Sequence, residues 1–94
     1  MYYETHITMD KVPDALALRT TLTAFSWHYS CIDGDPTYGK KKLHYATGHY
    51  TGDWKLEEVQ DAIDRMAGML LEKGYSVIRR KIEMVMYDVR TISQ

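Results

Sequence analysis

The stretch YYETHITMDKVPD, residues 2–14, decides the fold, because it changes from a strand pattern to a helix start within a few residues. From Tyr2 to Met9 two sets of side chains alternate, which is the period of a β-strand with two different faces. Pro13 and Asp14 follow, and both residue types favour the first turn of a helix. The stretch therefore predicts a strand that leads directly into a helix.

The rest of the chain continues these two patterns. Ala15, Leu16, Arg19 and Leu22 follow Pro13 and Asp14 at helical spacing, which predicts the first helix. Alternation predicts a second strand over 25–31, a third over 43–50 and a fourth over 75–87. A turn at 33–36 and a lysine loop at 39–42 separate the second and third strands, and the tail after Val89 is expected to be frayed. A second helix over about 54–73 ends at Gly74 and carries an apolar stripe of Leu56, Val59, Ile63, Met66, Ala67 and Leu70.

The element order β-α-β-β-α-β, together with short connections and right-handed crossovers, predicts an α+β ferredoxin-like sandwich. Residues 1–94 would form a single domain. Its four strands would make one antiparallel sheet in the order fourth, first, third, second, with both helices on one face. The other face of the sheet would be open to water, a ligand or a second subunit.

Composition narrows the classes of function. A net charge of −1 argues against broad nucleic-acid binding, which needs a basic surface. The chain contains no apolar run long enough to span a membrane, and its polar start is not that of a signal peptide. Cys31 is the only cysteine, and we expect it to be a small buried hydrophobe in a reducing, cytoplasmic compartment.

Three of the four histidines are followed two residues later by a hydroxyl residue, in His6-Ile7-Thr8, His28-Tyr29-Ser30 and His49-Tyr50-Thr51. Residues i and i+2 of a strand point to the same face, so each triplet can place an imidazole beside a hydroxyl. An imidazole can carry a proton near neutral pH, and a hydroxyl can donate a hydrogen bond to a phosphate oxygen.

The same alternation assigns side chains to the open face. If Ile7 and Met9 face the helices, then His6 and Thr8 face outward, and His28 does so in the second strand. With Ile78 and Ile82 inward in the fourth strand, Arg79 and Lys81 also face outward, while Arg80 reaches solvent near the sheet edge. This surface suits a phosphate or carboxylate ligand. The alternative is an ordinary solvated sheet face, with ion pairs such as Glu4 with Arg79 or Lys81.

In the third strand, the same alternation turns the histidine motif away from the open face. Leu43 and Tyr45 are expected to face inward, which would turn Thr47, His49 and Thr51 inward as well. A bulge at Gly48 would reverse the alternation and bring His49 beside His6.

At His6-Ile7-Thr8-Met9 the chain resembles the two-histidine phosphoesterases, which carry two His-x-Thr/Ser motifs on facing strands of two ferredoxin-like lobes. The resemblance implies that His6 is an acid/base and Thr8 a phosphate binder, with His49 and Thr51 as the second pair. The substrates of that superfamily are phosphodiesters, often 2′,3′-cyclic or 2′-5′ linked. This chain departs from the family in having one lobe, and in having Gly52 after the second triplet. A two-fold dimer packed open face to open face would restore a cleft between two lobes.

The sequence thus predicts a homo-oligomer that binds a small phosphate-containing ligand, foremost a nucleotide or cyclic nucleotide, and sequesters it without metal or other cofactor. Two alternatives remain: a phosphodiesterase of the two-histidine type, and a non-catalytic oligomerisation or protein-interaction module. The candidate acid/base residues are His6 and His49, and the candidate ligand-binding residues are Thr8, Thr51, His28, Arg79 and Lys81.

Overall fold

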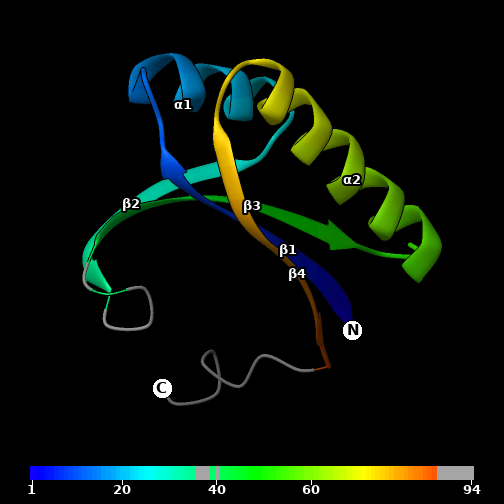
Figure 1. Ribbon diagram of the computed structural model, residues 1–94. Helices are drawn as coiled ribbons and strands as arrows, with labels where there is room; N and C mark the ends of the chain where they lie inside the picture. The colour runs from blue at the N-terminus through cyan, green and yellow to red at the C-terminus, as the bar shows by residue number, and fades with distance from the viewer. Residues whose placement is uncertain (36–38, 40, 87–94) are drawn as a thin grey trace.

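A computed structural model describes residues 1–35, 39 and 41–86. Its elements follow the predicted order (Figure 1): β1 (Tyr2–Lys11), α1 (Ala15–Ala24), β2 (His28–Asp35), β3 (Lys41–Thr51), α2 (Leu56–Glu72) and β4 (Ser76–Val85). Strand β2 therefore continues through part of the turn predicted at 33–36, and β3 begins inside the predicted lysine loop. Residues 36–38 and 40, and the tail for which fraying was predicted, lie outside the described residues.

The strands form one antiparallel sheet in the order β2-β3-β1-β4. This is the predicted order, and the α+β ferredoxin-like arrangement is confirmed. Both described helices cover the same face of the sheet (Figure 1), so neither of them lies on the opposite face. Strands β1 and β3, which hold His6 and His49, are the two inner strands. No helix in the described part of the chain is long and apolar enough to cross a membrane.

Helix α1 begins at a side-chain cap. Asp14 Oδ1 accepts a hydrogen bond from the backbone N–H of Ala17 at 3.0 Å, which satisfies one of the free donors at the helix start. The helix buries Leu18 and Leu22, whereas Leu16 is 73% exposed. The predicted spacing was right about Leu22 and wrong about Ala15, Leu16 and Arg19, which are exposed, because a helix capped at Asp14 turns Leu18 toward the sheet.

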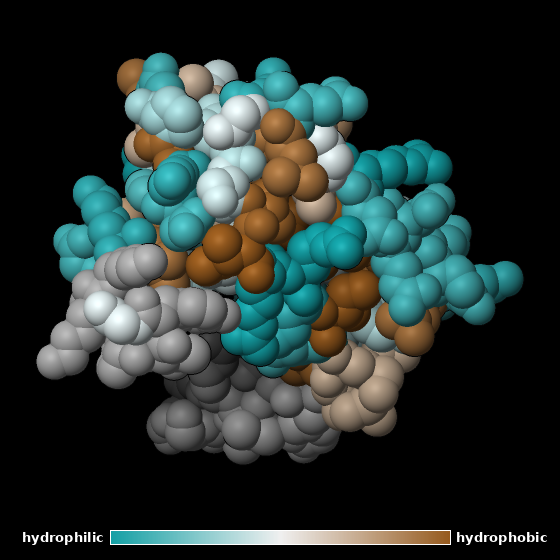
Figure 2. All heavy atoms as spheres, viewed as in Figure 1, coloured by the Kyte–Doolittle hydropathy of each residue, from teal (hydrophilic) through white to brown (hydrophobic). Residues whose placement is uncertain are grey.

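Helix α2 buries most of its predicted stripe: Val59, Ile63, Met66, Ala67 and Leu70. Leu56, the first residue of the helix, is the exception and is exposed. Figure 2 shows that apolar side chains form a band across this view, bordered by hydrophilic side chains. The core lies between the helix layer and the sheet, where residues of α1 and α2 meet Ile7, Met9 and Ala46.

The second strand begins later than predicted. Helix α1 continues to Ala24, Phe25 is its C-terminal cap, and Ser26 has a positive φ of 62°. The chain turns there, so Phe25 is 56% exposed, while Trp27 is buried and precedes the first residue of β2.

The fourth strand is interrupted by a bulge. Thr8 lies opposite Arg79, but the next residue, Met9, lies opposite Val77, which leaves Ile78 without a place in the ladder. Val77 packs against the core, and Ile78 is 41% exposed. The prediction that Ile78 faces the helices was therefore wrong, whereas Ile82 packs against the core as predicted.

The third strand faces the opposite way from the prediction. Tyr45 lies opposite Thr8, and Ala46 and Gly48 lie on the core side opposite Ile7 and Thr5. Gly48 is required there, because a Cβ atom at this position would lie 2.5 Å from Cε2 of Trp27. The β1–β3 register has no shift, so ordinary alternation brings His49 to the open face, and no bulge at Gly48 is needed.

Candidate functional site

The open face carries polar side chains in rows that cross the sheet. Directly paired residues of antiparallel strands point to the same side, so the register defines these rows. One row runs His28, Thr47, His6, Lys81, and the next runs Ser30, Tyr45, Thr8, Arg79. A third row runs His49, Glu4, Glu83. We call the polar set at the centre of these rows the open-face cluster: Glu4, His6, Thr8, Tyr45, Thr47, His49, Arg79, Lys81 and Glu83.

His6 lies at the middle of the open-face cluster. Its Nδ1 lies 3.3 Å from the hydroxyl oxygen of Thr47, and its Nε2 lies 3.1 Å from Oε1 of Glu83. Oε1 of Glu4 is 3.9 Å from the same Nε2. Glu4 and Glu83 are directly opposite each other on β1 and β4, an arrangement that is unfavourable for like charges. The imidazole of His6 lies between the two carboxylates, within hydrogen-bond distance of Glu83 and farther from Glu4.

Glu4 connects the two histidines of the central strands. Its Oε1 lies 3.4 Å from Nε2 of His49 and 3.9 Å from Nε2 of His6. The solvated-face alternative placed Lys81 beside Glu4, but Lys81 Nζ pairs with Glu83 at 2.9 Å. The two candidate acid/base residues thus share one carboxylate on one face of the sheet.

Lys81 and Glu83 form the edge of the open-face cluster on β4. The hydrogen bond from Lys81 lowers the pKa of Glu83, and the positive charges of Lys81, His6 and Arg79 lower it further against the opposing effect of burial. Glu83 is therefore a carboxylate near neutral pH.

A small hollow of about 120 Å³ opens between β3, β1 and β4. Its lining is His6, Thr8, Tyr45, Arg79 and Lys81. Thr8 is only 4% exposed and forms the floor between Tyr45 and Arg79, its direct neighbours in the two adjacent strands. The hollow thus joins one guanidinium, one ammonium, one imidazole and two hydroxyl groups, all of which can donate hydrogen bonds to an anion.

The seven residues predicted for the site all lie on the open face, but they are not equally close together. His6, Thr8, Arg79 and Lys81 line the hollow. His49 reaches the cluster through Glu4. His28 is exposed on β2 opposite Thr47, and Thr51 is exposed at the far end of β3, opposite Tyr2.

Tyr45 and Thr47 belong to this cluster, although the alternation predicted for β3 turned both of them inward. The signal that identifies them is the pair of small residues, Ala46 and Gly48, at alternate positions of the same strand. Small residues on the inner face leave room for Trp27, which makes the polar set the outer one.

The other face of β2 and β3 holds a second polar group. The Tyr29 hydroxyl and Nδ1 of His44 are 2.7 Å apart, and the two rings stack with centroids 5.9 Å apart. Burial is the main cause that raises the pKa of Tyr29 and lowers that of His44, so both are neutral, and the His44 tautomer sets which of the two groups donates the hydrogen bond. Cys31, paired with His44 in the register, is exposed, so the prediction of a buried cysteine was wrong.

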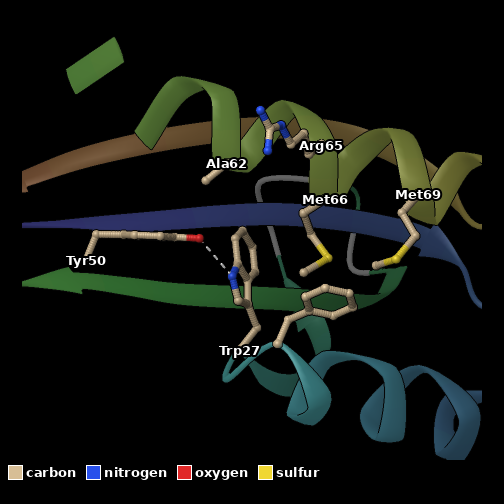
Figure 3. Close-up of a pocket in the computed structure, with 7 residues that line it drawn as sticks. Trp27, Tyr50, Ala62, Arg65, Met66 and Met69 are labelled. Carbon is tan, nitrogen blue, oxygen red and sulfur yellow. Dashed lines mark hydrogen bonds between the residues drawn. The ribbon is translucent and has the colours of Figure 1, made fainter. Parts of the chain in front are cut away.

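A larger hollow of about 430 Å³ lies on the helix side, and Figure 3 shows its lining. The lining is Phe25, Trp27, Tyr50, Ala62, Arg65, Met66 and Met69. The indole N–H of Trp27 donates to the Tyr50 hydroxyl at 3.0 Å, and Arg65 pairs with Asp61 at 3.1 Å. This hollow is apolar and holds no set of convergent acid and base groups, so the open-face cluster is the better candidate for phosphate chemistry.

Arg80, predicted to reach solvent near the sheet edge, does so and pairs with Asp64 of α2 at 2.7 Å.

Within residues 1–35, 39 and 41–86, no group of three or more His, Cys, Asp and Glu side chains is arranged to hold a metal ion.

Comparison with known proteins returned no match: none among protein-family models, and none of sufficient significance among curated proteins or solved structures.

Proposed function

We propose that the open face binds a small phosphate-containing ligand, foremost a nucleotide or cyclic nucleotide, and sequesters it. The observation that carries the proposal is the hollow at Thr8, where Arg79, Lys81 and His6 converge with two hydroxyl groups. Arginine and lysine next to a hydroxyl-lined floor match the charge and the acceptor oxygens of a phosphate.

The test compares Arg79→Ala with Arg65→Ala, which removes an exposed arginine from the opposite layer. Thermal unfolding is followed with inorganic phosphate, mononucleotides and cyclic mono- and dinucleotides. A ligand at 100 times its Kd stabilises the folded state by about 2.7 kcal/mol. We expect a shift with a phosphate compound in the wild type and in Arg65→Ala, and a much smaller one in Arg79→Ala. If Arg79→Ala, Lys81→Ala and His6→Ala all leave the affinity unchanged, the open-face site is wrong.

A second candidate function is phosphodiester hydrolysis. One observation favours it: Nε2 atoms of His6 and His49 both lie within 4 Å of the same oxygen of Glu4. Two imidazoles on one face can serve as acid and base on opposite sides of a phosphate. If His6 is such a group, His6→Ala lowers turnover by roughly 10²- to 10⁴-fold while binding survives.

Mass spectrometry of the ligand released after denaturation separates the two functions. Recovery of intact nucleotide supports sequestration. A linear or monomeric product that disappears in His6→Ala supports the phosphodiesterase. Binding of a protein or peptide, with no thermal shift from any phosphate compound, would instead support the interaction module.

The proposal includes assembly of the chain with itself. Strands β2 and β4 are the edges of the described sheet, and an edge strand has backbone groups free to pair with another copy. A two-fold dimer would also place two open faces around one ligand. Light scattering at micromolar concentration tests this, and a strict monomer would remove the dimer cleft. The proposed location is the cytoplasm, where a free thiol such as Cys31 stays reduced.

A further inference from the structure

The open face has opposite charges at its two ends. Arg79 lies beside Thr8 at one end, and Glu4 lies opposite Glu83 at the other. Glu4 and Thr8 are four residues apart on β1, which corresponds to about 13 Å at roughly 3.3 Å per residue. A ligand that reaches from the hollow to the carboxylates therefore needs an anion at one end and hydrogen-bond donors at the other.

The two carboxylates differ in how their oxygens are used. Glu83 Oε1 is held by the Lys81 ammonium at 2.9 Å and by His6 at 3.1 Å. Within the described residues, the contacts of Glu4 Oε1 are the longer ones to His49 and His6, at 3.4 Å and 3.9 Å. A carboxylate has about four acceptor positions, so Glu4 can take further donors from a ligand.

Aromatic rings border Glu4 on the same face. Tyr2 precedes it by two residues on β1, and His49 lies directly opposite it on β3. The two ring centroids are 6.3 Å apart with their planes tilted by 43°. Such rings offer faces on which a nucleobase can stack while its polar edge meets the carboxylate.

We infer that the ligand is a guanine nucleotide, with its phosphate in the hollow at Thr8 and its base beside Glu4. This inference rests on the proposed function. The Watson–Crick edge of guanine carries two adjacent donors, the ring N1–H and the exocyclic amino group, and one carboxylate can accept from both. Adenine and cytosine place an acceptor nitrogen next to their amino group, and uracil has one N–H between two carbonyl oxygens, so these edges match a carboxylate less well.

Isothermal titration of the full chain with GMP, IMP, AMP and UMP tests the assignment. We expect GMP to bind about 10- to 100-fold more tightly than UMP or AMP, the range of a hydrogen bond to a charged group. IMP, which keeps the ring N–H and lacks the amino group, falls between them. Glu4→Gln removes the preference for GMP and changes UMP affinity less than about twofold, whereas Glu57→Gln, an exposed position on α2, changes neither.

The outcomes separate this inference from the function on which it rests. Equal affinities of GMP, IMP, AMP and UMP for the wild type overturn the guanine assignment and leave phosphate binding intact. An equal loss of affinity for all four nucleotides in Glu4→Gln also overturns it, because Glu4 would then act on the phosphate side. No binding of any nucleotide or of inorganic phosphate overturns the proposed function itself. The comparison of GMP with IMP uses the wild type alone, so it stands even if Glu4→Gln folds poorly.

Discussion

Substitution of Gly48 by alanine tests the packing that orients the site strand β3. A Cβ atom at this position would lie 2.5 Å from Cε2 of Trp27 and 2.7 Å from Oγ1 of Thr5. Both neighbours are buried, at 6% and 0% exposure, so neither can move into solvent without opening the core. Because the indole must shift, the variant also strains the hydrogen bond from Trp27 to Tyr50.

Three contributions determine how much Gly48→Ala changes the free energy of unfolding. Overpacking of a core costs about 1–3 kcal/mol. Loss of the Trp27–Tyr50 hydrogen bond adds about 1 kcal/mol. In the opposite direction, alanine loses less backbone entropy on folding than glycine, which stabilises the variant by about 0.5–1 kcal/mol. We expect Gly48→Ala to lower the free energy of unfolding by about 2 kcal/mol, which lowers Tm by about 8–16 °C in a domain of this size.

Urea and thermal unfolding, followed by circular dichroism, measure the effect, and the chain supplies a control of opposite sign. Gly68 lies within α2, and a Cβ atom there would meet nothing within 4 Å. Gly68→Ala is therefore expected to raise stability by about 1 kcal/mol, the difference in helix propensity. If Gly48→Ala is as stable as the wild type, the close contact with Trp27 does not exist, and the orientation argued for β3 loses its physical basis.

Three further predictions concern other parts of the molecule. Asp14→Ala removes the cap of α1 and is expected to destabilise the fold by about 1 kcal/mol in urea unfolding, so an unchanged midpoint would contradict the capping contact with Ala17. The pKa of His44 is lowered by burial and by Lys42, so its contribution to stability is complete above the ordinary histidine pKa of about 6.5 and is lost as the pH falls through the lower folded-state pKa. Between pH 7 and pH 5 the wild type is therefore expected to lose more stability than His44→Gln, and parallel pH profiles would refute this. Cys31 is exposed, so one equivalent of a thiol reagent is expected to react with the native protein at the rate of a free thiol, whereas reaction only after unfolding would show that the side chain is covered.

Much of the fold followed from periodicity because the signals were strong. The alternation of β1 and the stripe of α2 each point to one face, and the element order then leaves few topologies. The assignment of His6, Thr8, Arg79 and Lys81 to a common face depended on β1 and β4, and the structure places these four residues around one hollow.

The facing of β3 did not follow from the sequence, for a physical reason. Both sets of alternate residues in β3 contain aromatic or polar groups, so hydropathy cannot distinguish them. A tertiary contact, the indole of Trp27 over Gly48, decides the orientation of β3, and its trace in the sequence is the small size of Ala46 and Gly48, which hydropathy does not register. The bulge at Ile78 was missed for a similar reason, since an extra residue in one strand is visible only against its partner strand.

The position of β1 and β3 inside the sheet has a further consequence. Each is paired on both sides, so its backbone amides are released to solvent only when the sheet comes apart. Amide hydrogen exchange beneath His6 and His49 is therefore expected to be among the slowest in the chain, before any ligand arrives. A molecule that docks on this face meets a floor that is already ordered, and the entropy lost on docking is then mainly that of the ligand and of the side chains that turn toward it.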